Sequence, residues 1–192
     1  AVDIRAYGLS DRLDIEVGKM EIRAESNNAY GMCDMLSSTI HADQALIEAK
    51  GSNVYGSSAH GIGASYGLSD NIHEMSGDDW TIKAQAQGNA TGIWMRNNDT
   101  LTMNVKNLDM TTLEGAHDVY GLEMREGNFR LNGEKLDIYA GLRNGGSRLA
   151  KGISAETQNG SKENSDIRLN VDNIDITAHG GAAEGIYNFS SQ

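Results

Sequence analysis

Proline is absent from this chain of 192 residues, and cysteine occurs once, at Cys33. Proline cannot donate a backbone hydrogen bond inside a sheet, so its absence is compatible with uninterrupted central strands. A single cysteine forms neither an internal disulfide framework nor a multi-cysteine zinc site. No stretch approaches the length of about 18 apolar residues that a membrane-spanning helix needs, so we expect that this segment is not membrane-inserted.

Basic residues are scarce as well. The chain carries 16 Lys and Arg against 27 Asp and Glu, which gives a formal charge of -11. Nucleic acids and anionic lipid surfaces attract basic patches, and the sequence contains no run of Lys or Arg. We therefore expect no nucleic-acid partner.

Seven copies of a four-residue motif divide the chain. The first is Ala-Tyr-Gly-Leu at residues 6–9, and each copy has Ala or Val, a variable residue, glycine and then Ile, Leu or Met. The glycines of the seven copies are Gly8, Gly31, Gly61, Gly92, Gly121, Gly152 and Gly185. Their successive spacings are 23, 30, 31, 29, 31 and 33 residues, and such a period predicts a stack of repeats that contact only their neighbours.

A block of twelve residues lies between successive motifs. Its six copies begin at Leu13, Ser38, His73, Leu101, Phe129 and Ile167. Positions 1, 3, 5, 8, 10 and 12 of the block are apolar except at Ser38, His73, Gly77, Thr112 and Gly133. Alternation at period two indicates a β-strand with one buried face rather than a helix.

The alternation is broken once in each block, where positions 6 and 7 both face outward, as at Asp78-Asp79. The strand is expected to bend there, and the glycine motif is expected to form a second bend. Each coil is therefore predicted to contain three short strands that pair in parallel with the next coil at a rise of about 4.8 Å. Parallel crossovers are generally right-handed, so we predict a right-handed parallel β-helix of about six coils of about 30 residues, forming one domain over residues 1–192.

The register of one coil stays open. Residues 68–72 repeat the pattern of residues 9–13, which would turn Ile72 inward, whereas the block alignment turns His73 inward. A bulge could satisfy both alternatives. If His73 is inward, we expect a neutral ring that is hydrogen-bonded within the core.

Coils of this length that end in Ala-x-Gly-Ile, with short alternating strands, no proline and an acidic exterior, resemble autotransporter passenger domains. These are the exported β-helical parts of Gram-negative type V secretion proteins. The resemblance implies a surface-exposed rod, outer-membrane-anchored or secreted, that mediates adhesion to a host-cell, matrix or bacterial-surface ligand, or self-association. Because neither end shows a polar capping segment, we expect the chain to be part of a longer passenger.

Two other functions stay open, namely a polysaccharide-active β-helix enzyme (a lyase or hydrolase) and a solenoid region of another cell-surface protein. An enzyme would show a groove lined by carboxylates with Arg or Lys. Asp78-Asp79 is the only Asp-Asp pair, and we interpret it as a solvated corner. The histidines occupy unrelated positions in their coils, and the calcium-binding nonapeptide is absent. We therefore expect no catalytic residues, no cofactor and no metal.

The first candidate binding set is a column of carboxylates. Asp109, Asp137 and Asp175 occupy block position 9 in consecutive coils, so they should stack on one face at about 4.8 Å. Like charges this close oppose ionisation, so Asp137 should have a raised pKa unless a cation intervenes. At block position 4 the residues Asn104, Asn132 and Asn170 are predicted to form a stabilising amide ladder.

The second candidate set is Arg143 and Arg148, which lie in a long polar connection between coils. In a solenoid the strands are constrained by stacking, so recognition tends to collect in such connections. Tyr30 and Tyr120 occupy the variable position of the motif and are expected to point outward. They lie three coils apart, so they are not expected to form a patch.

Overall fold

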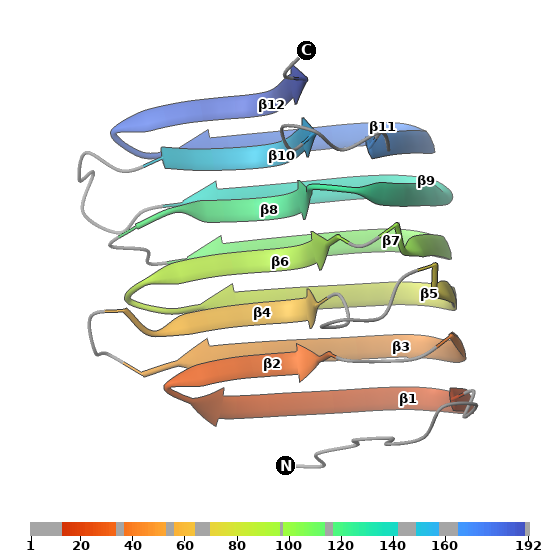
Figure 1. Ribbon diagram of the computed structural model, residues 1–192. Coiled ribbons are helices and arrows are strands. Elements are labelled where there is room, and N and C mark those ends of the chain that lie inside the picture. The colour runs from red at the N-terminus through yellow and green to blue at the C-terminus, as the bar shows by residue number, and fades with distance from the viewer. Residues whose placement is uncertain are drawn as a thin grey trace.

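Every regular element in the described part of the chain is a β-strand, as the alternation predicted. The computed structural model describes residues 13–33, 37–52, 56–63, 70–96, 98–113, 117–141, 149–157 and 165–190. The strands form two sheets, and within each sheet they follow one another in sequence order (Figure 1). None of the described residues form a helix that is long and apolar enough to cross a membrane.

Each coil contributes one long strand to the first sheet and one shorter strand to the second. The long strands, which form sheet A, are β1 (Leu13–Ser26), β3 (Ser38–Gly51), β5 (Ile72–Gln85), β7 (Thr100–Leu113), β9 (Gly127–Gly141) and β11 (Ser165–His179). The shorter strands, which form sheet B, are β2 (Asn28–Met32), β4 (Ser58–Gly63), β6 (Asn89–Met95), β8 (Val119–Met124), β10 (Leu149–Thr157) and β12 (Ala182–Ser190).

The chain winds as a right-handed parallel β-helix, as predicted. In Figure 1 the strands of sheet B lie in front and run to the right, those of sheet A lie behind and run to the left, and the coils rise from the N- to the C-terminus. Every neighbouring pair of strands in both sheets is parallel. Because the connection between parallel strands runs through the opposite sheet, each coil pairs only with the coils before and after it.

The register matches the sequence blocks residue for residue. Leu13 pairs with Ser38, Ser38 with His73, and His73 with Leu101. This register settles the open coil: the His73 side chain is 5% exposed, whereas that of Ile72 is 56% exposed. The buried His73 ring is hydrogen-bonded to the preceding coil, with Nδ1 2.9 Å from Ser38 Oγ.

The prediction of three strands per coil is wrong, because the bend inside each block does not end the strand. Strands β1 and β3 pair continuously except at Gly18 and Asp43, the first position of the two outward residues. A break of one or two residues changes the direction of the strand while the ladder continues on both sides, so the whole block remains one strand of sheet A.

The core lies between the two sheets. Inward residues of sheet A, such as Ile47, Trp80 and Phe129, pack against the aliphatic residues of the motif, such as Ile93 and Leu122. Where the long strand turns into the short one, the sheets are close together and the core narrows to a separate row of alanines. This row consists of Ala29, Ala49, Ala59, Ala84, Ala86 and Ala90.

A column of glycines brings sheet B against sheet A. A Cβ placed on Gly121 would collide with Cγ2 of Ile138 and would lie 2.5 Å from the carbonyl oxygen of Gly152 in the next coil. The same approach to the next glycine of the column, at 2.6 Å, occurs at Gly31, Gly61, Gly92 and Gly152. Only a residue without a Cβ fits at these five positions, which explains why glycine recurs in their motifs.

The amide ladder on sheet A is confirmed. Asn132 Nδ2 donates to Asn104 Oδ1 at 2.8 Å, and Asn170 Nδ2 donates to Asn132 Oδ1 at 3.4 Å. Each amide can donate to one neighbouring coil and accept from the other, so the ladder ties three consecutive coils together.

Replacing a glycine of the column should destabilise the protein more, the more closely other atoms surround that glycine. We expect Gly121→Ala to lower the free energy of unfolding by about 1–3 kcal/mol, because the added methyl group meets both a core side chain and a backbone carbonyl. Gly185→Ala is the matched control, since a Cβ there meets no atom within 4 Å. Denaturant titration of both variants measures the difference, and equal destabilisation would contradict the packing role of the column.

The buried His73 should make stability depend on pH. Burial lowers its pKa to about 4 from 6.5, so between these values the unfolded chain binds a proton that the folded chain does not. Stability is therefore lost as the pH falls from 6.5 to 4, at about 1.4 kcal/mol per pH unit from this one residue. In His73→Phe the slope of unfolding free energy against pH should decrease by that amount, whereas His179→Gln, which changes an exposed histidine, should leave the slope unchanged.

Candidate functional site

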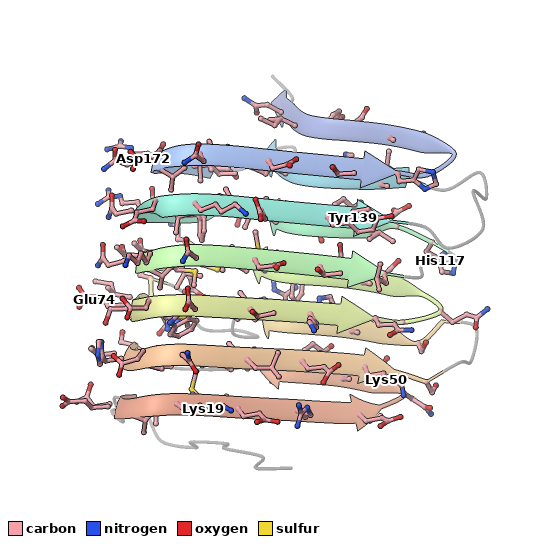
Figure 2. The ribbon with its side chains drawn as sticks, turned by 180° about the vertical axis from the view of Figure 1, so that it is seen from behind. Lys19, Lys50, Glu74, His117, Tyr139 and Asp172 are labelled. Carbon is pink, nitrogen blue, oxygen red and sulfur yellow. The ribbon has the colours of Figure 1, made fainter. Side chains whose placement is uncertain are left out.

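The outer faces of the two sheets differ in burial. Outward side chains of sheet A, such as Lys19 and Tyr139, project into solvent (Figure 2). Outward side chains of sheet B are largely buried, although the described residues form no third layer of strands. Tyr120, Glu123 and Lys151 are only 8%, 4% and 3% exposed. The outer face of sheet B is therefore not an ordinary solvated surface.

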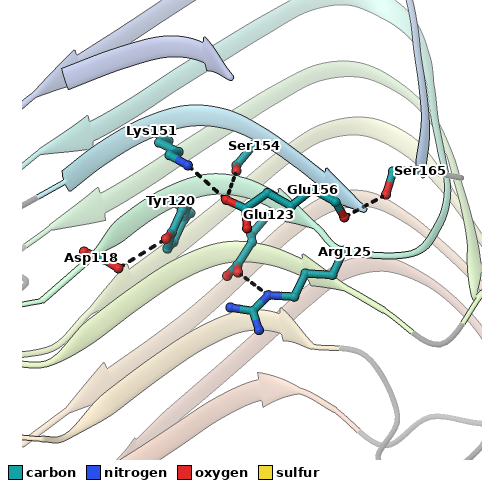
Figure 3. A network of polar contacts seen from close by, with 8 residues as sticks. All are labelled: Asp118, Tyr120, Glu123, Arg125, Lys151, Ser154, Glu156 and Ser165. Atoms are coloured by element: carbon teal, nitrogen blue, oxygen red, sulfur yellow. Dashed lines mark hydrogen bonds and ion pairs between the residues drawn. The ribbon is translucent and has the colours of Figure 1, made fainter. Parts of the chain in front are cut away.

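The glycine column accounts for this burial. Because it draws the middle of each sheet B strand toward sheet A, the strands arch and the outer face becomes hollow, with the outward side chains gathered beneath the arch (Figure 3). A cleft of about 260 Å³ opens in this hollow. It is lined by Tyr30, Ser58, His60, Asn89, Thr91, Trp94, Asp118, Tyr120, Glu123 and Arg125.

One wall of the cleft is a stack of rings from three consecutive coils. The rings of Tyr30 and His60 lie 5.1 Å apart with 13° between their planes, and His60 lies 5.1 Å from Trp94 at 30°. The neighbour of Trp94 in β4 is Gly63, which leaves room for the indole. The Arg96 guanidinium covers Trp94 at 4.4 Å from the ring centroid.

The column that begins with Tyr30 and His60 is interrupted at the third coil. The register places Thr91 between His60 and Tyr120, so a small side chain stands where the neighbouring coils have rings. Thr91 is 1% exposed and lies at the floor of the cleft. In this coil the ring that stacks on His60 belongs to Trp94, from the same strand as Thr91.

A network of charges lies on the other side of Tyr120 (Figure 3). Lys151 Nζ lies 2.9 Å from Glu156 Oε1 and 3.8 Å from Glu184 Oε2. The same ammonium lies 3.3 Å from the centroid of the Tyr187 ring and 5.9 Å from that of Tyr120. The hydrogen bond and charge of Lys151 lower the pKa of Glu156 despite the opposing effect of burial, so this buried lysine faces an ionised carboxylate.

A second ion pair closes one end of the cleft. Arg125 Nε donates to Glu123 Oε1 at 2.9 Å, and the Glu123 side chain is far more buried than that of Arg125. Burial raises the pKa of Glu123, and the Arg125 guanidinium opposes this rise without cancelling it. At the opposite end Tyr120 Oη donates to Asp118 Oδ2 at 3.3 Å. Burial and the nearby carboxylates raise the pKa of Tyr120, so its hydroxyl remains protonated and able to donate.

His60 carries a polar atom that the folded chain leaves unsatisfied. Its Nδ1 is buried and has no hydrogen-bond partner among the residues that the structure describes. Burial, reinforced by the charge of Arg96, lowers the pKa of His60 to about 4, so the ring is neutral near pH 7. Burying such an atom without a partner costs about 1–3 kcal/mol, and a cost of this kind calls for an explanation in a native structure.

This combination of groups favours binding of a polar ligand over metal chemistry. In the described part of the chain no group of three or more His, Cys, Asp or Glu side chains could hold a metal ion. Rings along the middle of the cleft offer apolar contact, and fixed donors and acceptors lie at its ends. Apolar walls with a few well-placed polar groups are typical of small-molecule and saccharide sites.

The predicted carboxylate column exists, but on the other sheet. Asp109, Asp137 and Asp175 are register partners in β7, β9 and β11, on the exposed face of sheet A. The cation that the sequence argument allowed for is Lys135, whose ammonium bonds directly to Asp137. The Asp137 hydrogen bond and charge raise the pKa of Lys135. The column is thus neutralised in part by the protein itself, and it lies apart from the cleft. The other predicted candidates, Arg143 and Arg148, lie outside the described residues.

The expectation that the outward tyrosines form no patch is wrong. Tyr30 and Tyr120 both line the cleft, because His60 and Thr91 occupy the coils between them and Trp94 leans over from the next outward column. The signal was present in the variable position of the motif, which reads Tyr, His, Thr, Tyr, Lys and Glu from Tyr30 to Glu184. This column contains several groups capable of recognition. Because we expected the residues at this position to point outward, their grouping was not recognised from the sequence.

Comparisons of the chain with protein-family models, with curated proteins and with solved structures find no significant match.

Proposed function

We propose that this β-helix is a recognition module, the adhesive segment of a surface-exposed bacterial autotransporter passenger, and that the cleft on sheet B is its ligand site. One observation carries the proposal: the outer face of sheet B gathers rings, ion pairs and an unsatisfied nitrogen into a single hollow. Motif periodicity and acidic composition, which resemble autotransporter passengers, support the surface location.

A rod that served only as a spacer would have no reason to bury these groups. Glu and Lys are almost never fully buried unless they are paired, and burying an ion pair gains little stability against apolar packing. Here Glu123 and Lys151 are both buried on the outer face of a sheet. Retention of such costly groups is expected where a ligand uses them.

The stacked coils make the cleft rigid. Strands β4, β6 and β8 are each hydrogen-bonded to a neighbour on both sides, and β2, at the edge of the sheet, is hydrogen-bonded to β4. Side chains held by such strands lose little freedom when a ligand binds, and low ordering cost favours affinity. The exposed face of sheet A, with its amide ladder and its Lys135–Asp137 ion pair, is the structural side of the rod in this proposal.

A polysaccharide-active enzyme is the second candidate, because the cleft holds two carboxylates, Asp118 and Glu123, together with Arg125. A raised pKa at Glu123 would suit a general acid. Glu123 already accepts a hydrogen bond from Arg125, however, which leaves it poorly placed to protonate a leaving group. We therefore rank binding before catalysis. Release of new reducing ends or unsaturated products from polysaccharides, lost in Glu123→Gln, would reverse this order.

Binding to cells tests the proposed function. Fluorescently labelled protein should bind saturably to host epithelial cells or to bacterial cells. Trp94→Ala, which removes a wall of the cleft, should weaken this binding about tenfold or more, equivalent to about 1.4 kcal/mol. Tyr139→Ala is the matched control, since it removes an aromatic ring from the outer face of sheet A.

Circular dichroism should show the same β-sheet signal for both variants. Binding that falls equally in the two variants, or that survives intact in Trp94→Ala, would place recognition outside the cleft. A wild-type protein that binds neither kind of cell would contradict the adhesive role.

A further inference from the structure

We infer that the cleft takes an uncharged pyranose sugar, seated between the ring stack and Tyr120 with one sugar hydroxyl donating a hydrogen bond to His60 Nδ1. The inference rests on the proposed function, since it names the ligand class of the same cleft.

The cleft offers aromatic side chains to a six-membered sugar ring. Tyr30, His60 and Trp94 form a stack from three coils, and Tyr120 lines the cleft from the next coil. Lys151, from β10, lies over the Tyr120 ring from the coil beyond it. A pyranose presents a flat patch of C–H groups that packs on an aromatic face, while its hydroxyl groups point sideways. Seated between the stack and Tyr120, it would contact rings from neighbouring coils.

His60 supplies an acceptor that only a ligand satisfies. Its Nδ1 is buried at the cleft wall and has no partner in the described part of the chain. Because the imidazole is neutral, one nitrogen can accept while the other carries the proton. A hydroxyl donor from a bound sugar would remove the cost of the unsatisfied atom, whereas an apolar ligand would leave the atom buried and unpaired.

The two ends of the cleft present further donors and acceptors. Asn89 Oδ1 accepts from the backbone N–H of Asp118 at 3.3 Å, which leaves the Asn89 amino group to donate to a ligand. Arg125 uses Nε for Glu123, and among the described residues none takes its two terminal nitrogens. Hydroxyl groups both donate and accept, so a ring bearing several of them can pair with Asn89, Asp118 and Arg125 at once.

The charges around the cleft favour an uncharged ligand. The carboxylates of Asp118 and Glu123 are balanced by the guanidinium groups of Arg125 and Arg96. A carboxylated sugar would bring a further negative charge beside two carboxylates, in a chain whose formal charge is already -11. An amino sugar with a free ammonium group would face the two guanidinium groups.

Two substitutions separate the ligand role from the structural role. His60→Phe keeps a ring in the stack but removes the acceptor, so we expect a higher melting temperature together with sugar binding weakened at least tenfold. Thr91→Tyr repeats the tyrosine found at the same position in three other copies of the motif and adds a ring to the cleft, so we expect binding to be lost while the fold is kept. Thr111→Tyr makes the same chemical change on the outer face of sheet A, beside Tyr139, and should bind like the wild-type protein.

Saturation-transfer NMR with the methyl glycosides of glucose, galactose and mannose, and with methyl glucuronide, measures binding directly. We expect at least one neutral glycoside to bind and the glucuronide to bind at least tenfold more weakly. Host cells and bacterial cells whose surface sugars have been oxidised by periodate then identify which source carries the ligand, since the protein should lose binding to that source only.

The other possible outcomes would each contradict one part of the proposal. If the protein binds cells but no neutral glycoside, and periodate leaves cell binding intact, the sugar inference fails while the proposed function stands. If neither cells nor glycosides are bound, both fail. If His60→Phe binds a glycoside as the wild-type protein does, the assignment of His60 as acceptor is wrong, and tighter binding of the glucuronide would overturn the argument from charge.

Discussion

The close approach of the two sheets at the glycine column determines the rest of this structure. At Gly121 the backbone of sheet B lies against Ile138 of sheet A and against the next glycine of the column, with no room for a Cβ. The same contact to the next glycine recurs from β2 to β10 and holds the middle of these strands toward the core. The same contact bends those strands, so it shapes the inside and the outside of the rod together.

The bend has opposite effects on its two sides. On the inner side, the core between the two sheets is narrow and consists of aliphatic side chains and a row of alanines. Neighbouring coils therefore present similar surfaces to one another. Outside, it creates a hollow in which outward side chains such as Lys151 and Glu123 are buried. A flat sheet would leave these side chains in water, as sheet A does with Lys19. The recurring glycine, which at first sight serves the fold alone, thus also forms the cleft.

Periodicity was sufficient to predict the architecture, because each inward position has an equivalent in every coil. The strand faces, the amide ladder from Asn104 and the stacking of Asp109 on Asp137 follow from alignment alone. The number of strands per coil did not follow, since two consecutive outward residues can bend a strand without ending its ladder. The cleft was missed for a related reason: curvature depends on the missing Cβ of the glycines, and without curvature Tyr120 appears as an exposed corner residue. Which ring stacks on which neighbour, as Trp94 does on His60, depends on three-dimensional packing that spacing does not encode.

The two tryptophans offer a direct test of whether ligands occupy the cleft. Trp80 is enclosed in the core, with Nε1 donating to the Ala42 carbonyl at 3.1 Å, whereas Trp94 lines the cleft. Protein labelled with 5-fluorotryptophan should give two fluorine resonances, which Trp94→Phe would assign. On titration with a sugar or a cell-surface extract that the protein binds, the Trp94 resonance should move saturably and the Trp80 resonance should stay. Saturable binding with no change at Trp94 would show that the ligand sits elsewhere on the rod and would contradict the account.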